Sequence, residues 1–202
     1  VVGTTHPSLA TAADVAAIEA VPVAHSTYEA LRLGMLANPA APAIHFLPTC
    51  DPAEPGLVIS HADYFARVTQ AANMFHTLGV GPGDVVSFLL PLIPQALYTV
   101  FGAEAAGISN PVNPLLEPHQ IAEILEAANT KVLVALGPTE GTDIWQKVEK
   151  LRGSLKNLKA IVQVGTASDE THGIYNFDTM LAKMPSDRLL GNRIINADDV
   201  AA

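Results

Sequence analysis

One stretch of the sequence, residues 79–136, constrains the fold more than any other because strand-like and helix-like segments alternate along it. Apolar runs at 85–90 and 131–136 are continuous, which is typical of strands in a parallel sheet covered on both faces. Helical patterns at 95–107 and 118–129 lie between them. Right-handed crossovers through such helices predict an α/β fold with a doubly wound, mostly parallel sheet, a flavodoxin-like layer.

The flanking sequence adds elements on both sides of this unit. Ser26 and Glu29 form a Ser-x-x-Glu capping box that starts a helix ending near Ala37. Ser60 caps a longer helix with one apolar stripe, and Gly79 ends it. The remaining expectations are a short helix near 12–20, a small β-hairpin of 43–47 and 57–59, a loop at 110–114, helices near 143–151 and 177–183, and a strand at 159–164.

Apolar spacing assigns the inner faces of these helices. The helix at 118–129 is expected to bury the residues at i, i+3, i+4 and i+7, namely Ile121, Ile124, Leu125 and Ala128. The large rings expected in the core are Phe75, Phe101 and Trp145. The helix at 95–107 is apolar almost all round and needs burial on several sides, whereas the sheet alone covers only one. We therefore expect a large exposed apolar face, and homo-oligomers formed through it.

The composition excludes several classes of protein. With 49% apolar and 15% charged residues, the 202-residue chain can bury a core and is not disordered. Eleven basic and twenty acidic residues give a net charge of −9, which argues against nucleic acid and anionic lipid as partners. The apolar segment 85–108 is cut by Pro91 and Pro94, so no transmembrane segment is expected. Cys50 is the only cysteine and 1–23 does not read as a signal peptide, which fits a cytoplasmic protein.

A glycine cluster at 79–83 superficially suggests a phosphate-binding loop. Such loops follow a strand and open a helix, so that backbone N–H groups point at the anion. Here the glycines follow a helix and precede a strand, which is the reverse order. A chain-reversing turn without a ligand is therefore the favoured interpretation.

Ligands in open parallel sheets gather at the carboxyl ends of the strands. Three loops qualify by position: 91–94, 137–142 and 165–168. The second is the best anion candidate, yet it has no lysine, and Glu140 and Asp143 would repel a phosphate. We favour the simpler interpretation, in which Thr142 is the N-cap of the following helix.

No side chain qualifies as catalytic, cofactor-binding or metal-ligating. The seven histidines are scattered, without a carboxylate or thiol at ligand spacing: His6, His25, His45, His61, His76, His119 and His172. Cys50 has no activating neighbour in sequence, so it is a poor nucleophile. We therefore assign no catalytic residue, no cofactor-binding residue and no metal site.

In order and spacing, the elements at 79–136 resemble the N-terminal part of the acyl- and aryl-CoA synthetases, the AMP-forming adenylating enzymes. Three shorter features add to this resemblance. Residues 60–64 are similar to the family's Thr-Tyr-x-Glu-Leu helix start, and 107–115 to its Gly…Asn-Pro turn. Residues 197–202 resemble the Asp-Asp-Val/Ile-Ala strand that leads into the family's Gly-rich, Lys-bearing loop. The resemblance covers Tyr28 to Ala202.

The resemblance implies an acid–CoA ligase that activates a carboxylic acid, with a fatty acid as the expected one, to acyl-AMP and transfers it to CoA. ATP, Mg²⁺ and CoA are then the cofactors of the intact enzyme. The implied division is an N-terminal arm at 1–25, an α/β subdomain of the AMP-binding domain at 26–165, and a linker at 166–202 toward the missing ATP-binding loop.

None of the family's ATP-binding or catalytic motifs matches a position here, so the resemblance implies a truncated enzyme that is inactive and binds none of these cofactors alone. Its partner would be the remainder of the synthetase chain, which would also form most of the acid pocket. The turn at Asn113-Pro114 either approaches the CoA channel or is a rigid structural turn, which we favour. The alternative hypothesis is a complete flavodoxin-like binding or interaction module without catalysis.

Overall fold

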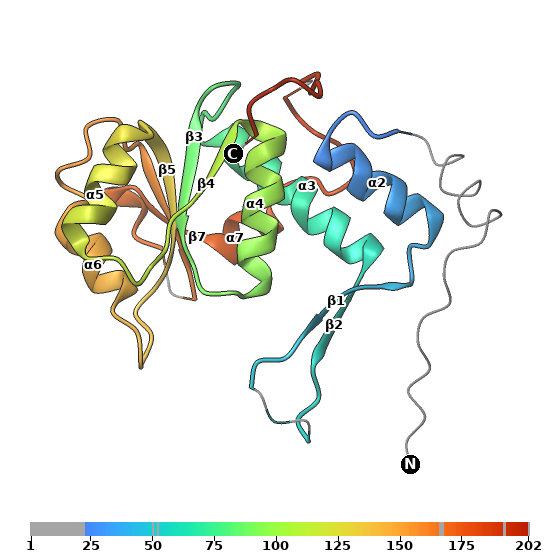
Figure 1. Cartoon of the computed structure of the whole chain (residues 1–202), viewed down its shortest axis with the longest axis horizontal. Coiled ribbons are helices and arrows are strands. Elements are labelled where there is room, and N and C mark those ends of the chain that lie inside the picture. The colour runs from blue at the N-terminus through green and yellow to red at the C-terminus, as the bar shows by residue number, and fades with distance from the viewer. Residues whose placement is uncertain (1–22, 50, 52, 166–167, 192, 202) are drawn as a thin grey trace, which may run out of the picture.

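The computed structural model describes residues 23–49, 51, 53–165, 168–191 and 193–201. These residues form a five-stranded parallel sheet with helices on both faces, and a two-stranded hairpin that projects from one end (Figure 1). The predicted doubly wound α/β fold is confirmed. The expected helix near 12–20 and Cys50 lie outside the described residues.

The strand order in the sheet is β4-β3-β5-β6-β7. Its strands are β3 (Val85–Leu89), β4 (Ile108–Pro111), β5 (Thr130–Leu136), β6 (Ala160–Val164) and β7 (Ile174–Asn176). The antiparallel hairpin consists of β1 (Pro42–Phe46) and β2 (Leu57–Ser60). The helices are α2 (Thr27–Ala37), α3 (His61–Thr77), α4 (Pro94–Ala106), α5 (Pro118–Ala127), α6 (Ile144–Leu151) and α7 (Phe177–Ala182), with a 3₁₀ turn at Glu170–His172.

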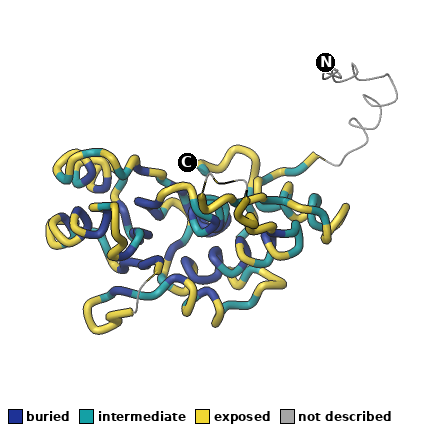
Figure 2. Tube along the Cα trace, turned by 90° about the horizontal axis from the view of Figure 1, so that it is seen from below, coloured by how far each residue is buried: buried dark blue, intermediate teal, exposed yellow. Residues whose placement is uncertain are grey.

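The sheet separates two apolar cores, and successive residues of each central strand alternate between them. In β5, Val132 and Val134 pack with α3, α4 and α7, whereas Leu133 and Ala135 pack with α5 and α6. All four are fully buried. Because both faces of the sheet are covered (Figure 2), the central strands are mostly apolar, which is the pattern that the sequence shows. Three buried polar residues interrupt this pattern: Ser87 in β3, Thr130 in β5 and Gln163 in β6. Phe75 and Trp145 are buried as expected, and Phe101 is partly buried against the first core.

Two strands lie where the sequence pattern predicts none. Ile108–Pro111 forms β4 at one edge of the sheet, where a loop was expected from 110 onward, and Ile174–Asn176 forms β7 at the other edge. Both are short, with three or four residues, and β4 contains an asparagine and a proline, which are uncommon in strands. Their pairing to β3 and β6, rather than local propensity, makes them strands.

Pro111 is tolerated in β4 because its nitrogen faces away from the sheet. The N–H groups of Ile108 and Val112 donate to Asp84 and Phe88 on the β3 side, at 2.9 and 3.1 Å. Residues 109 and 111 therefore face outward, and a proline there removes no bond of the ladder. The Ser109 N–H donates to the Ala201 carbonyl at 2.8 Å, so the outer edge of β4 offers no free N–H at these two positions. Such an edge resists pairing with a second sheet.

Helix α4 is covered by more than the sheet, which agrees with the expectation that it needs burial on several sides: each of its residues is buried or partly buried. Gly102 lets α3 approach closely, since a Cβ at that position would lie 2.6 Å from the Cβ of Ala71. On another side, the Thr27 hydroxyl at the start of α2 donates to Glu104 at 2.6 Å. The guanidinium of Arg193 donates to the Glu104 and Gly107 carbonyls at the end of α4. Helices α3 and α2 and the Arg193 side chain thus cover faces of α4 that the sheet leaves open.

Two smaller expectations need correction. The N-cap of α6 is Asp143 rather than Thr142, although the Thr142 hydroxyl accepts a hydrogen bond from the Ile144 N–H at 3.3 Å. In α5, Ile121 and Leu125 are buried, but Ile124 is 37% exposed and Ala128 is half-buried. Positions i+3 and i+7 lie at the margin of this stripe because the helix contacts the sheet along a narrow line.

The turn between α3 and β3 is held by an ion pair. Lys131 at the start of β5 donates to the Asp84 carboxylate at 2.8 Å and to the Gly79 carbonyl at 2.6 Å. Burial raises the pKa of Asp84, but the hydrogen bonds from Lys131 and the Gly81 N–H outweigh it and hold that pKa below its usual value. The Asp84 carboxylate is therefore stabilised in its charged form by the folded chain.

Replacing Asp84 with asparagine should destabilise the chain in a pH-dependent way. Because the folded-state pKa lies below the unfolded-state value, the carboxylate stabilises the fold above about pH 4 and this contribution disappears as the pH falls through the folded-state pKa. The pair is partly exposed, so we expect a loss of about 1 kcal/mol at pH 7. Urea unfolding of the wild type and of Asp84→Asn at pH 7 and pH 3 measures the difference. A gap that stays constant between the two pH values would contradict the assignment, and the exposed Asp198→Asn is the control.

Candidate functional site

The two strands that follow β3 in sequence, β4 and β5, lie on opposite sides of it in the sheet. Helix α4 connects β3 to β4 on one face, and α5 then connects β4 back to β5 on the other side of β3. Ligands of open α/β sheets bind outside the carboxyl ends of the strands at such a switch point. The candidate site is therefore the carboxyl-end edge, which we define as the loops 90–93, 112–117 and 137–143 that follow β3, β4 and β5.

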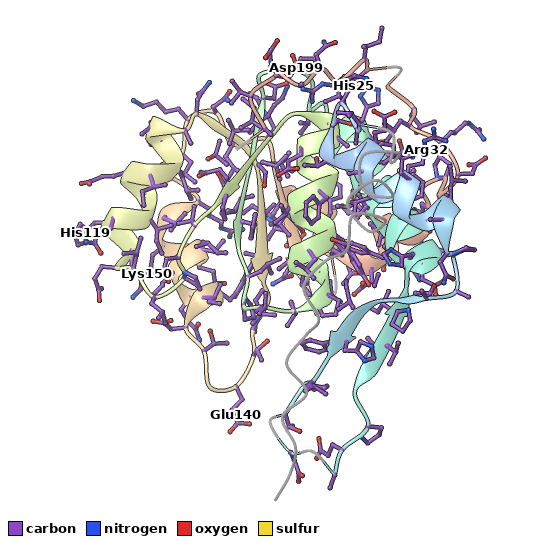
Figure 3. The ribbon with its side chains drawn as sticks, turned by 45° about the vertical axis from the view of Figure 1, so that its right-hand side comes forward. His25, Arg32, His119, Glu140, Lys150 and Asp199 are labelled. Carbon is purple, nitrogen blue, oxygen red and sulfur yellow. The ribbon has the colours of Figure 1, made fainter. Side chains whose placement is uncertain are left out.

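The carboxyl-end edge is apolar and acidic. Leu92 is 82% exposed and Leu115 is 84% exposed, so the described residues leave most of both side chains uncovered. Glu117 and Glu140 are exposed, and Glu140 projects from the tip of its loop (Figure 3). The three loops contain no lysine or arginine. This edge therefore offers contact surface for an apolar group, and no positive charge for a phosphate.

A lysine of α6, Lys147, lies close to this edge, and the sequence pattern did not predict its place there. Lys147 of α6 is buried, donates to the Pro114 carbonyl at 2.8 Å and pairs with Asp143 at 3.1 Å. The Lys147 ammonium thus links the loop after β4, through Pro114, to the loop after β5, through Asp143. Only its i, i+4 spacing from Asp143 could have suggested the ion pair.

The hairpin extends to the same end of the molecule as the carboxyl-end edge (Figures 1 and 3). Its exposed apolar side chains are Leu47, Leu57 and Val58, which are more than half exposed. Cross-strand neighbours Phe46 and Leu57 continue the face on which Ile44 and Ile59 pack against the first core. The outer half of this face has no partner among the described residues, so apolar surface accumulates at this end of the molecule.

The glycine turn lies at the opposite, amino-end edge of the sheet. Gly79 has a φ of 85° and follows α3 directly, as expected for a helix stop. Gly83 also has a positive φ, and the Asp84 carboxylate accepts the Gly81 N–H at 2.9 Å. The Gly81 N–H is therefore already hydrogen-bonded to Asp84 and is not available to a phosphate.

The other candidates from the sequence are not brought together. Within the described residues no three histidines, cysteines or acidic residues are placed to hold a metal ion, and His6 and Cys50 lie outside that set. Of the loop 165–168, residues 166–167 are not described. At Asn113, the side-chain oxygen accepts the Leu115 N–H at 3.0 Å and the carbonyl accepts that of Leu116 at 3.3 Å. These bonds form a rigid turn.

The sequence profile of one family of proteins, the AMP-binding enzymes, matches residues 35–202. The chain belongs to the AMP-binding enzyme family. Among curated relatives, the marinolic acid–CoA ligase of Pseudoalteromonas sp. (strain SANK 73390) is 30% identical over 143 residues. The 4-coumarate–CoA ligase 1 of Arabidopsis thaliana is 35% identical over 80 residues, which cover 39% of this chain and 14% of that protein. Recognition of the family from 60–64, 107–115 and 197–202 is thus confirmed.

Solved structures of this family share the fold of the chain. The anthranilate CoA ligase AuaEII in complex with anthranoyl-AMP superposes with a TM-score of 0.68 at 21% identity, over 88% of this chain and 31% of that one. An acetoacetyl-CoA synthetase from Streptomyces lividans gives the same TM-score over 89% of this chain and 27% of that one. At these identities the likeness shows the fold alone.

The chain covers only part of the length of its relatives. The region similar to the marinolic acid–CoA ligase is 71% of this chain and 21% of that protein. For the crotonobetaine/carnitine–CoA ligase of Salmonella arizonae the corresponding shares are 70% and 27%. The 202 residues thus correspond to a partial, N-terminal portion of such enzymes. No helix among the described residues is long and apolar enough to cross a membrane.

Proposed function

We propose that this chain is the N-terminal α/β subdomain of an acid–CoA ligase. The intact enzyme activates a carboxylic acid with Mg-ATP to an acyl-adenylate and pyrophosphate, and the CoA thiol then displaces AMP to form the thioester. The observation that carries this proposal is the family match over 35–202, together with relatives that are named as CoA ligases. A fatty acid is the first substrate to assay, and the cytoplasm is the proposed location.

We further propose that the chain alone binds no Mg-ATP and forms no acyl-adenylate. Transfer of an adenylyl group needs positive charge or hydrogen-bond donors around the triphosphate. The carboxyl-end edge has neither a lysine nor an arginine, and its Glu117 and Glu140 would repel the phosphates. Lys147 is buried in its own contacts with Pro114 and Asp143. The residues present do not fit Mg-ATP, so we assign no catalytic step to them.

The role that remains for this subdomain is structural. Leu92, Leu115 and the tip of the hairpin expose apolar surface at the end where an open α/β sheet receives its ligand. Apolar surface of this kind is usually covered by a partner. We propose that the remainder of the synthetase covers it and encloses the acid substrate against it. In the isolated chain the same surface would be free for contact with a second copy.

The proposal is tested by comparing two proteins, the 202-residue chain and the product of the whole reading frame. Acid-dependent exchange of labelled pyrophosphate into ATP measures adenylate formation, and release of AMP with CoA present measures thioester formation. We expect both reactions only in the longer product, because it would supply the phosphate-binding groups that this chain lacks.

A further inference from the structure

A hollow of about 230 Å³ lies at the amino ends of β6 and β7, away from the carboxyl-end edge. The segments that form it are the end of α6, the residues before β6 and the turn before β7. Its floor is apolar, with Ile161 buried and Leu158 half-buried. Its remaining side chains include Arg152, Lys159 and His172, and no acidic residue lines it.

The concentration of basic groups is unusual for this chain. Only eleven lysines and arginines occur in 202 residues with a net charge of −9, yet two of them and a histidine surround this hollow. Within the described residues, neither the Arg152 guanidinium nor the Lys159 ammonium makes a hydrogen bond or an ion pair. By contrast, Lys131, Lys147 and Arg193 are engaged by carboxylates and backbone carbonyls. The two cations at the hollow are therefore available to a ligand.

His172 is oriented by its own turn. Its Nδ1 lies 2.7 Å from a carboxylate oxygen of Asp169, whose other oxygen accepts the Thr171 hydroxyl at 2.7 Å. The hydrogen bonds from Thr171 and His172 lower the pKa of Asp169, so the carboxylate stays charged beside the imidazole. With Nδ1 held by Asp169, Nε2 is the ring nitrogen left for a ligand.

We propose that this hollow binds a phosphate monoester that has a small apolar group. A guanidinium and an ammonium match the two negative charges and several acceptor oxygens of a phosphate better than the single charge of a carboxylate. The apolar floor formed by Leu158 and Ile161 contacts the organic group of the ester. The site lies at the opposite edge of the sheet from the proposed acid-activating end, so it does not depend on the proposed ligase activity.

The experiment is an NMR titration of the 202-residue chain in a low-salt buffer without phosphate. Phenyl phosphate, inorganic phosphate and benzoate are the three probes. We expect saturable shifts of the backbone amides at 159–161 and 172–173, with phenyl phosphate binding at least about five-fold more tightly than the other two probes. Equal affinity for benzoate would overturn the charge argument, and equal affinity for inorganic phosphate would overturn the role of the apolar floor.

Variants test whether the named side chains form the site. Arg152→Gln and Lys159→Gln should each weaken phenyl phosphate binding about five-fold, because each removes one charge-assisted contact. Lys150→Gln is the matched control, since Lys150 is an exposed cation that does not line the hollow and projects to the outside of α6 (Figure 3). Unchanged thermal unfolding of all three variants shows that the fold is kept. Unchanged affinity in both Arg152→Gln and Lys159→Gln, or no saturable shift in the wild type, would overturn the proposal.

Discussion

Replacing Gly102 with alanine should destabilise the chain by about 2–3 kcal/mol, even though alanine favours helices. A Cβ at this position would lie 2.6 Å from the Cβ of Ala71 and 3.0 Å from the backbone nitrogen of Ala72. The backbone of α3 cannot yield locally, so α3 and α4 would have to separate. That movement would loosen the core formed by Val68, Ala103 and their neighbours, which is fully buried. Urea unfolding monitored by circular dichroism measures the loss.

The matched control is Gly34→Ala in α2. Gly34 also lies within a helix and lacks a positive φ, but a Cβ there would meet only the His61 ring at 3.5 Å, an ordinary contact. Gain of helix propensity should therefore stabilise this variant by about 0.5–1 kcal/mol. If Gly102→Ala proved as stable as Gly34→Ala, the close contact between α3 and α4 would not exist in solution.

The second large effect is expected at Asn73, a buried side chain of α3 that holds the C-terminal segment. Its amide nitrogen donates to the carbonyls of Pro185 and Arg188, and its oxygen accepts the Leu190 N–H, all at 2.8 Å. Asn73→Ala removes three hydrogen bonds and leaves three backbone groups without their partner. We expect a loss of about 2–3 kcal/mol and faster proteolysis within 185–190.

Gln70→Ala provides the comparison for Asn73. Gln70 lies one turn earlier on α3 and makes a single bond to the same segment, at the Met184 carbonyl. It is half-buried, so its removal should cost less than about 1 kcal/mol and should change proteolysis little. A similar proteolysis rate in Asn73→Ala and the wild type would show that the segment is held by other contacts.

The long elements could be predicted from the sequence because each has a strong local signal. Ser26 and Ser60 accept backbone N–H groups three residues later, as their capping patterns indicate, and Gly79 ends α3. The mostly apolar runs at β3, β5 and β6 indicate a sheet covered on both faces. These signals predict the long helices and strands and their order along the sequence.

The edge strands and the segments that cover α4 could not be predicted, because both depend on contacts between residues distant in sequence. A proline at position 111 is unfavourable in a strand unless its nitrogen faces away from the neighbouring strand. Which way the nitrogen faces depends on the pairing of β4 with β3. The cover of α4 comes from Thr27 and Arg193, which lie 77 and 89 residues from Glu104. The spacing of apolar residues along the sequence gives no information about contacts between residues so far apart.

The candidate site was predictable in position but not in detail. Strand order and the switch-point rule place it at the carboxyl-end edge, and the loops 91–94 and 137–142 were expected there. The use of Lys147 to join Pro114 and Asp143 was not visible in the sequence, and neither was the gathering of Arg152, Lys159 and His172 around one hollow. Arg152 and Lys159 lie in the connection between α6 and β6, and His172 lies in the turn before β7, which the pairing of β6 and β7 brings beside them.

Acid-dependent pyrophosphate exchange tests the central claim most directly, because it measures adenylate formation without requiring CoA. The assay compares the 202-residue chain with the product of the whole reading frame, using acetate, octanoate, palmitate and 4-coumarate. We predict exchange with at least one acid in the longer product and none in the chain, whose carboxyl-end edge has no cation for the triphosphate. Exchange catalysed by the 202-residue chain, or a reading frame that codes for no further chain, would contradict the account.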